Sequence, residues 1–177
     1  MAILSVNKLT KSFGGLTAVS NLNMELEKGE LVGLIGPNGA GKTTVFNLLT
    51  GVYAPTSGTI VLEANNKKMA LHGHKPYYIC DAGVARTFQN IRLFKDLTVL
   101  DNVRIAMHKN VKYGLLSSFL HLPSYKTEEK RLLDESRELL RIMKLDGKEN
   151  EYAKNLPYGD QRHLEIARAL ATKPSLL

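Results

Sequence analysis

The chain has 177 residues, 44% of them hydrophobic, and a net charge of +7 that arises from 24 Lys and Arg against 17 Asp and Glu. This length supports one sizeable core with a small subdomain, and the single cysteine, Cys80, excludes an internal disulfide and favours a reducing compartment. We expect no signal peptide, because the first residues lack a basic segment followed by a long apolar stretch, and no membrane-spanning segment, because no apolar run reaches about 18 residues. The positive charge is scattered rather than interleaved with aromatic residues, so nucleic acid is not an expected partner.

Short strands are predicted in the first half of the chain from runs of apolar or alternating residues. They cover residues 2–9, 18–27, 30–35, 58–63 and 83–89. The run at 30–35 is almost wholly apolar, which is typical of a buried strand in a parallel sheet. Residues 44–49 are predicted to begin a helix. The polar residues 65–68 are predicted to close the strand at 58–63.

Helices are predicted mainly in the second half of the chain, at residues 98–107, 127–144 and 162–170. Thr98 and Asp101 have the spacing of a capping box, which marks the start of the first of these helices. The uncharged stretch 113–125 predicts a helical hairpin or a loop that packs on the domain. We therefore expect a mostly helical segment at about 90–150.

Residues 36–43 match the phosphate-binding pattern G-x-x-x-x-G-K-[ST], between a predicted strand and a predicted helix. Glycines let the backbone curl so that successive N–H groups point at phosphate oxygens, and the helix N-terminus adds further donors. In this pattern Lys42 reaches the β- and γ-phosphates, and the Thr43 hydroxyl binds Mg²⁺. The alternative is a chance glycine-rich turn, which the flanking elements disfavour. The sequence therefore predicts a nucleotide site.

A second motif, residues 156–161, precedes the predicted helix at 162–170. Gly159 allows close backbone approach there, so the helix could present N–H groups to an anion. Many helices begin after Gly or Asp, and this motif alone is therefore a weak indication.

Taken in order, these features resemble the nucleotide-binding cassette of ABC transporters over the whole chain. Phe13 matches the aromatic residue that stacks on adenine in that family, and residues 36–44 match its Walker A segment. Gln89 matches the glutamine that contacts Mg²⁺ and the attacking water and links to the membrane subunits. The resemblance implies a nucleotide site made of Phe13, Gly36, Pro37, Asn38, Gly39, Ala40, Gly41, Lys42, Thr43 and Thr44.

The resemblance also implies roles in catalysis and assembly. Lys42 and Gln89 are the expected catalytic residues, and Thr43 and Gln89 the expected Mg²⁺ ligands. The signature residues, which contact the ATP of a partner subunit, are Tyr158, Gly159, Asp160 and Gln161. ATP and Mg²⁺ are the implied cofactors. The implied partners are a second ABC ATPase subunit, identical or different, and integral membrane permease subunits, which place the protein on the cytoplasmic face of the membrane.

Three segments are most similar to the ATPase subunits of branched-chain amino acid importers: Arg-Thr-Phe-Gln at 86–89, residues 92–94, and residues 158–162. The region at 114–116 also suits that group. The expected function is ATP hydrolysis coupled to import, through a head-to-tail dimer with ATP between Walker A and the partner's signature. The alternatives are a soluble ABC ATPase of DNA repair or translation, and a nucleotide-binding fragment that does not hydrolyse.

The expected fold is α/β: a P-loop NTPase core with a mostly parallel sheet, an antiparallel β portion and an inserted helical subdomain. The whole of 1–177 is expected to be an incomplete ABC nucleotide-binding domain. Its expected parts are a core at 1–89 with Walker A, the helical subdomain at 90–155, and the signature helix with the start of the Walker B strand at 156–177.

Two departures from the family pattern bear on activity. The signature commonly has Ser where this chain has Pro157, and Pro lacks both a hydroxyl and an N–H. The Walker B Asp, the catalytic Glu and the switch His would follow Leu177. We therefore expect the 177 residues by themselves to bind nucleotide weakly, to hydrolyse almost none, and to expose apolar sheet surface.

Several single residues have a second interpretation. Phe13 could be an ordinary core aromatic, and Gln89 an ordinary polar loop residue. His72 and His74 resemble a metal-binding pair, but surface histidines are the preferred interpretation because no Cys or carboxylate cluster is close in sequence. His163 is expected on the solvated side of its helix.

Overall fold

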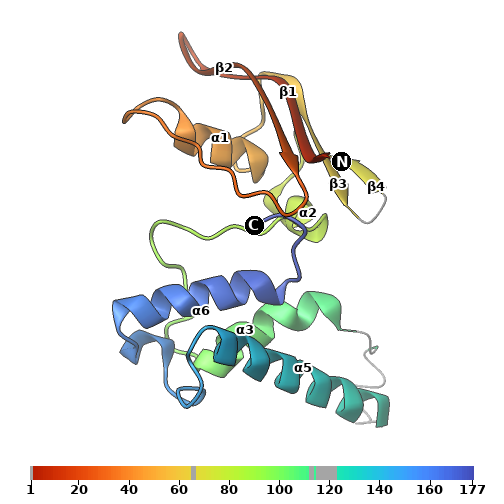
Figure 1. The fold of residues 1–177 in the computed structure, drawn as a ribbon, viewed down its shortest axis with the longest axis vertical. Helices are drawn as coiled ribbons and strands as arrows, with labels where there is room; N and C mark the ends of the chain where they lie inside the picture. Colours follow the sequence, from red (N-terminus) through yellow and green to blue (C-terminus); the bar gives the residue numbers. More distant parts are fainter. Residues whose placement is uncertain (1, 65–66, 112–113, 115–122) are drawn as a thin grey trace. The chain divides into compact units, whose positions relative to one another are not determined.

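The computed structural model describes residues 2–64, 67–111, 114 and 123–177 (Figure 1). It consists of two units, each with its own core. The β unit is Met1–Val84 with Leu176, and the helical unit is Ala85–Ser175 with Leu177. Each unit is described separately below.

The β unit is built on one four-stranded antiparallel sheet with the order β2-β1-β3-β4. Its strands are β1 (Ala2–Phe13), β2 (Leu16–Glu27), β3 (Ser57–Ala64) and β4 (Lys67–Ala70). Leu4 lies opposite Leu62 and Val6 opposite Ile60, and all four side chains are buried. Alternation along the strands therefore places one apolar face of the sheet in the core.

Two helices contribute to the same core (Figure 1). Helix α1 (Lys42–Leu49) buries Val45 and Leu48, and the short helix α2 (Pro76–Asp81) buries Ile79. The helix predicted at 44–49 is thus confirmed and begins two residues earlier. Helix α2 was not predicted; its Pro76 occupies a first-turn position that tolerates the missing N–H of proline.

The strand predicted at 30–35 is wrong. This segment is irregular, and its Leu31 and Ile35 side chains are 98% and 94% exposed. A strand is held by hydrogen bonds to a neighbouring strand, and none of the strands that the structure describes pairs with these residues. The apolar surface exposed here therefore belongs to an irregular segment and is not the sheet surface that was expected.

The parallel part of the sheet is also much smaller than predicted. Of the strand expected at 83–89, only Val84 pairs, in a single parallel bridge with Leu176. The Leu176 N–H donates to the Gly83 carbonyl at 3.1 Å. Among the described residues, this bridge is the only parallel pairing. The continuous four-stranded sheet is antiparallel. Residues 67 and 68, expected with 65 and 66 to close the strand at 58–63, belong to β4 because they pair with β3. Residues 65 and 66 lie outside the described residues.

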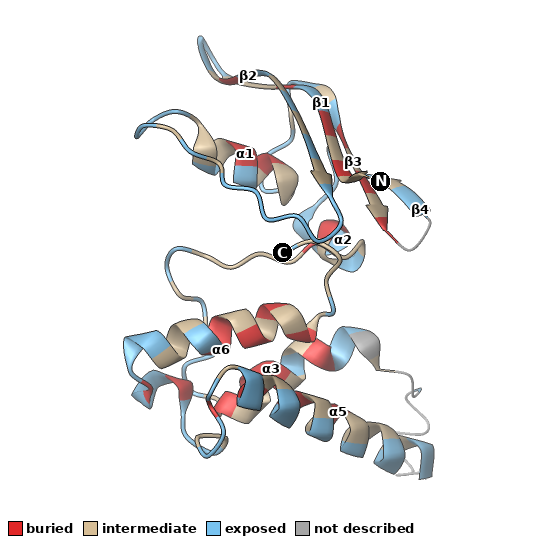
Figure 2. Ribbon diagram, viewed as in Figure 1, coloured by how far each residue is buried: buried red, intermediate tan, exposed pale blue. Residues whose placement is uncertain are grey.

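In the described residues of the helical unit, three helices pack around a second core. They are α3 (Val99–Met107), α5 (Pro123–Ile142) and α6 (Tyr158–Ala171), accompanied by short 3₁₀ turns at His108–Asn110 and Ala153–Asn155. Figure 2 shows buried residues on all three helices, and their side chains, among them Val103, Leu140 and Leu164, form one apolar cluster. None of the helices in the described residues is long and apolar enough to cross a lipid bilayer.

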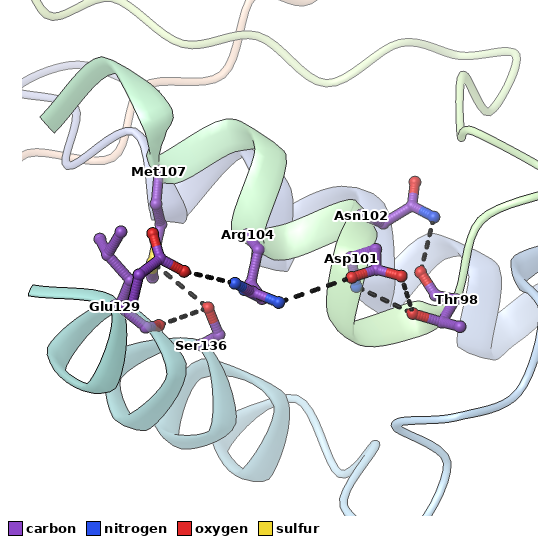
Figure 3. Close-up of polar contacts among 8 residues, drawn as sticks. Thr98, Asp101, Asn102, Arg104, Met107, Glu129 and Ser136 are labelled. Carbon is purple, nitrogen blue, oxygen red and sulfur yellow. Dashed lines mark hydrogen bonds and ion pairs between the residues drawn. The ribbon is translucent and has the colours of Figure 1, made fainter. Parts of the chain in front are cut away.

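Helix α3 begins as predicted. The Thr98 oxygen accepts the Asp101 N–H at 3.0 Å, and its hydroxyl donates to the Asp101 carboxylate at 2.7 Å (Figure 3). Asn102, buried on the same helix, accepts the Phe94 N–H and donates to the Phe94 and Thr98 carbonyls. The segment before α3 is therefore fixed to the helix by one side chain.

Polar contacts also join α3 to α5. The Arg104 guanidinium and the Glu129 carboxylate are 2.6 Å apart, and the buried Ser136 hydroxyl lies 3.3 Å from the Met107 sulfur (Figure 3). Helix α5 starts at Pro123, four residues before its predicted start, and ends at Ile142. Of the hairpin or loop expected at 113–125, the last three residues belong to α5, while 113 and 115–122 lie outside the described residues.

Helix α6 starts at Tyr158, four residues before the predicted helix. Pro157, with φ −55°, occupies the N-cap, and the Gln161 N–H donates to its carbonyl at 3.0 Å. Proline fixes φ near the helical value and lacks an N–H, so it suits this end of a helix. The signature residues 158–161 are consequently the first turn of α6 and not a loop before it.

Candidate functional site

The loop at 36–41 leads into α1 through two glycines with left-handed backbone angles. Gly39 has φ +84° and Gly41 has φ +83°. A Cβ on Gly41 would lie 2.3 Å from the Ala18 carbonyl oxygen of β2, so glycine is required there on steric grounds as well. The sharp turn into the helix thus depends on the glycines of the sequence pattern.

The N-terminus of α1 suits an anion. The Val45 N–H donates to the Gly41 carbonyl at 2.9 Å, which leaves the amides of Lys42, Thr43 and Thr44 at the open end of the helix. The first turn contains no acidic residue. The partial positive charge of a helix N-terminus favours a phosphate at such a position.

The Lys42 ammonium lies over the loop. It donates to the Gly36 carbonyl at 2.6 Å and to the Pro37 carbonyl at 2.7 Å. An ammonium has three N–H donors, so these contacts leave one for a further acceptor. Thr43 is exposed and Thr44 half-buried, while Pro37, Asn38, Gly39 and Ala40 are all exposed. The residues present therefore fit a bound triphosphate.

Phe13 ends β1 and is 42% exposed. Its ring contacts Tyr53 edge to face with centroids 5.3 Å apart, and the Lys11 ammonium lies 4.9 Å from its centroid. The alternative of a buried core aromatic is therefore wrong. An exposed ring can stack on a base, and the role of Phe13 in adenine stacking stays a prediction.

The signature residues differ in what their side chains contact. Tyr158 and Gly159 are exposed. The Asp160 carboxylate lies 2.5 Å from the Lys148 ammonium, and this hydrogen bond holds the pKa of Lys148 above its ordinary value. The Gln161 amide donates to the Leu156 carbonyl at 2.8 Å. Two of the four predicted residues thus use their side chains within the helical unit, which leaves Tyr158, Gly159 and backbone amides for a partner.

Gln89 lies in the helical unit, in the irregular segment that follows Val84, and is exposed. Thr43, the other predicted Mg²⁺ ligand, lies in the β unit, so the joint role of these two residues stays a prediction. Among the described residues, no three His, Cys, Asp or Glu side chains gather into a metal site. A hydroxyl at a helix N-terminus beside a phosphate is compatible with Mg²⁺, which keeps few protein ligands.

The two histidines of the 72–74 segment have separate partners. The His72 ring is half-buried, with its Nδ1 3.2 Å from the Ile60 carbonyl oxygen, whereas His74 is exposed and stacks on Tyr78 with centroids 4.1 Å apart. His163 is exposed on α6, as expected.

Three charged residues of α6 that were not predicted as functional hold the Gln89 segment. Glu165 accepts the Phe88 N–H at 3.1 Å, and Arg162 donates to the Phe88 carbonyl. Arg168 donates to the Arg92 carbonyl, and burial lowers its pKa. The sequence contains one signal of this contact, which is that Glu165 stands between apolar neighbours in an amphipathic helix. A charge on a buried helix face requires a partner.

Comparison with known proteins identifies the fold and the family. The family model described as "ABC transporter" matches residues 19–177. The high-affinity branched-chain amino acid transport ATP-binding protein LivG of Escherichia coli K12 is 49% identical over 175 residues, covering 99% of this chain and 67% of LivG. The chain belongs to the ABC transporter family.

Other members of the ABC transporter family are also similar to this chain in sequence and in fold. BraF of Pseudomonas aeruginosa, also a high-affinity branched-chain amino acid transport ATP-binding protein, is 43% identical with the same coverage. The ATP-binding cassette MJ1267 of an ABC transporter has a TM-score of 0.77 at 30% identity, covering 98% of this chain and 66% of that cassette. MJ1267 has also been solved in an ADP conformation, with a TM-score of 0.77 at 29% identity.

These findings confirm the α/β P-loop fold of an ABC ATPase and the similarity to the ATP-binding proteins of branched-chain amino acid import. The chain spans about two thirds of the length of these relatives.

Proposed function

We propose that the chain is part of the ATP-hydrolysing subunit of an ABC importer for branched-chain or related amino acids. The observation that carries this proposal is the Walker A loop. Two glycines with left-handed backbone angles and the Lys42 ammonium lie there at the N-terminus of α1. The names of the relatives favour an importer over a soluble ABC ATPase of DNA repair or translation and over a non-hydrolysing fragment.

In this proposal each Walker A group acts on phosphate oxygens. The amides at the start of α1 bind the β-phosphate, and Lys42 donates its remaining N–H to a β- or γ-phosphate oxygen, which offsets charge that amides alone cannot neutralise. Phe13 stacks on adenine. Bound Mg²⁺ would further neutralise the phosphates, with Thr43 and Gln89 as its protein contacts.

The assembly in this proposal pairs the Walker A loop of one subunit with the signature turn of a second subunit. Tyr158 and Gly159, at the exposed start of α6, would meet the γ-phosphate of the partner's ATP together with the backbone amides of that turn. Pro157 supplies no hydroxyl there, so backbone donors carry more of the contact. Permease subunits in the membrane would receive the movement that hydrolysis releases, on the cytoplasmic face.

Nucleotide binding tests the first part of the proposal. We expect Lys42→Ala to weaken binding of a fluorescent ATP analogue about ten-fold or more, because a charge-assisted hydrogen bond is lost. Lys28→Ala is the control, since Lys28 is an exposed lysine of the same unit in the turn after β2. Equal affinities of wild type and Lys42→Ala would show that this loop is not the phosphate site.

Solute uptake tests the second part. In cells that carry Lys42→Ala at the chromosomal locus, we expect uptake of labelled leucine, isoleucine or valine to fall, while the Lys28→Ala strain takes them up normally. Normal uptake of all three amino acids in the Lys42→Ala strain would contradict the assignment to their import without affecting the binding result.

A further inference from the structure

A buried carboxylate stands out on α6. Glu165 is 5% exposed, in a helix whose other buried side chains are apolar. Its Oε1 accepts the Phe88 N–H at 3.1 Å, and its Oε2 lies 2.7 Å from the Arg162 guanidinium. A buried carboxylate costs free energy unless it is paired and hydrogen-bonded, so packing alone does not require Glu165.

The same ion pair holds both polar groups of one residue. Arg162 donates to the Phe88 carbonyl, while Glu165 accepts the Phe88 N–H. The Phe88 ring is held as well, because the Arg92 and Arg86 guanidiniums lie 4.1 and 5.0 Å from its centroid. Phe88 is thus fixed through its backbone and its ring, directly before the exposed Gln89.

We propose that Glu165 and Arg162 are positioning residues that hold Gln89 in register with the signature turn. This inference rests on the role of Gln89 in the proposed function. Arg162 directly follows the signature residues 158–161 and Glu165 lies one turn further, so one helix carries both the signature and the anchor of Gln89. A shift of α6 along its axis therefore displaces the peptide before Gln89.

Amide hydrogen exchange tests the positioning directly, without nucleotide. In Glu165→Ala we expect the Phe88 amide to exchange about ten-fold faster or more, since its hydrogen bond to a charged group is lost. The amides in the middle of α6 should keep their rates. Unchanged exchange at Phe88 would overturn the proposal.

Two further variants separate this effect from general loss of structure. Glu138→Ala is the matched control, because Glu138 pairs with Arg141 at 2.8 Å with the same three-residue spacing on an exposed helix face. It should leave Phe88 exchange unchanged. Glu165→Gln keeps an acceptor oxygen and the side-chain shape, and we expect intermediate exchange. It also replaces the alanine variant if circular dichroism shows that the latter does not fold.

Binding of a fluorescent ATP analogue with and without Mg²⁺ gives a readout that a purely structural role would not change. Glu165→Ala and Gln89→Ala should each reduce the gain in affinity that Mg²⁺ provides, with Mg²⁺-free affinity retained, and the double variant should lose no more than Gln89→Ala. If Mg²⁺ provided a smaller gain in affinity in Gln89→Ala but the full gain in Glu165→Ala, the proposal would be overturned. An unchanged gain in Gln89→Ala would refute the role of Gln89 itself, and the exchange rates would then decide on positioning.

Discussion

At the scale of single residues, the two glycines of the phosphate loop provide a matched pair. Both have φ near +84°, but a Cβ on Gly39 meets no atom within 4 Å, whereas one on Gly41 would lie 2.3 Å from the Ala18 carbonyl oxygen. We expect Gly39→Ala to lower the free energy of unfolding by about 1–2 kcal/mol through left-handed strain alone. Gly41→Ala should cost more, because β2 must move. Urea denaturation measures both, and equal costs would contradict the steric constraint.

The Phe13 ring allows a second test at this scale. Base stacking on an aromatic side chain contributes about 1–3 kcal/mol in nucleic-acid complexes. We expect Phe13→Ala to weaken ATP binding roughly ten-fold and to leave tripolyphosphate binding unchanged, and Phe13→Tyr to behave as wild type. Calorimetric titration with both ligands measures the difference. An equal loss for ATP and tripolyphosphate would show that the substitution disturbs the loop and not a base contact.

Glu135 of α5 gives a pH-dependent prediction. Its carboxylate lies 2.8 Å from the Lys173 ammonium and 2.5 Å from the Arg131 guanidinium, and the Lys173 hydrogen bond, followed by that of Arg131, holds its pKa below the ordinary 4.5. A carboxylate with a lowered folded-state pKa stabilises the fold above its unfolded pKa, and this contribution is lost as pH falls through the folded value.

We therefore expect Glu135→Gln to reduce the free energy of unfolding by about 0.5–1 kcal/mol at pH 7 and by less at pH 3. Urea denaturation at the two pH values checks this difference. The same loss at both would mean that the carboxylate charge is not what stabilises this contact.

At the scale of elements, the capping box of α3 is open to a direct measurement. Thr98→Ala removes the acceptor of the Asp101 N–H, and we expect a loss of about 1 kcal/mol in the free energy of unfolding. Thr127→Ala is the comparison, because the Thr127 hydroxyl donates to the Pro123 carbonyl within a helix, where alanine costs little. Similar losses in the two variants would contradict a specific role for the cap.

Elements with local signals could be predicted from the sequence. The capping box places the start of α3, and alternation predicts the first two strands. Both strands are longer than predicted, because β1 continues to Phe13 and β2 already begins at Leu16. The segment 30–35 could not be placed, because an apolar run does not reveal whether a neighbouring strand is there to pair. The start of α6 could not be predicted, because glycine more often precedes a helix than lies in its first turn, whereas here Pro157 caps the helix and Gly159 lies within it.

The candidate site divides in the same way. Glycine spacing predicts the loop at 36–41, since the backbone angles follow from the residue type. The contact between Phe88 and Glu165 joins residues 77 positions apart, and no local pattern encodes it. The sequence indicates only that Glu165 needs a partner, not which one.

At the scale of the whole molecule, the two cores predict a separation of mutational effects. Leu62 in the core of the β unit and Leu164 in that of the helical unit are both fully buried. We expect Leu62→Ala and Leu164→Ala each to cost about 2–5 kcal/mol, with faster amide exchange mainly in the unit that carries the substitution. Exchange measured across the chain serves as the check, each variant being the control for the other. Equal acceleration in both units from either variant would contradict separate cores.

The bridge between Val84 and Leu176 has a topological consequence. Two parallel neighbours cannot be joined by a tight turn and need a crossover connection of a dozen or more residues. The chain from 85 to 175, which includes α3, α5, α6 and the signature, is one such crossover. Shorter or different crossovers would satisfy the same geometry, so this stretch could be exchanged for that of a relative while the pairing at its ends is retained.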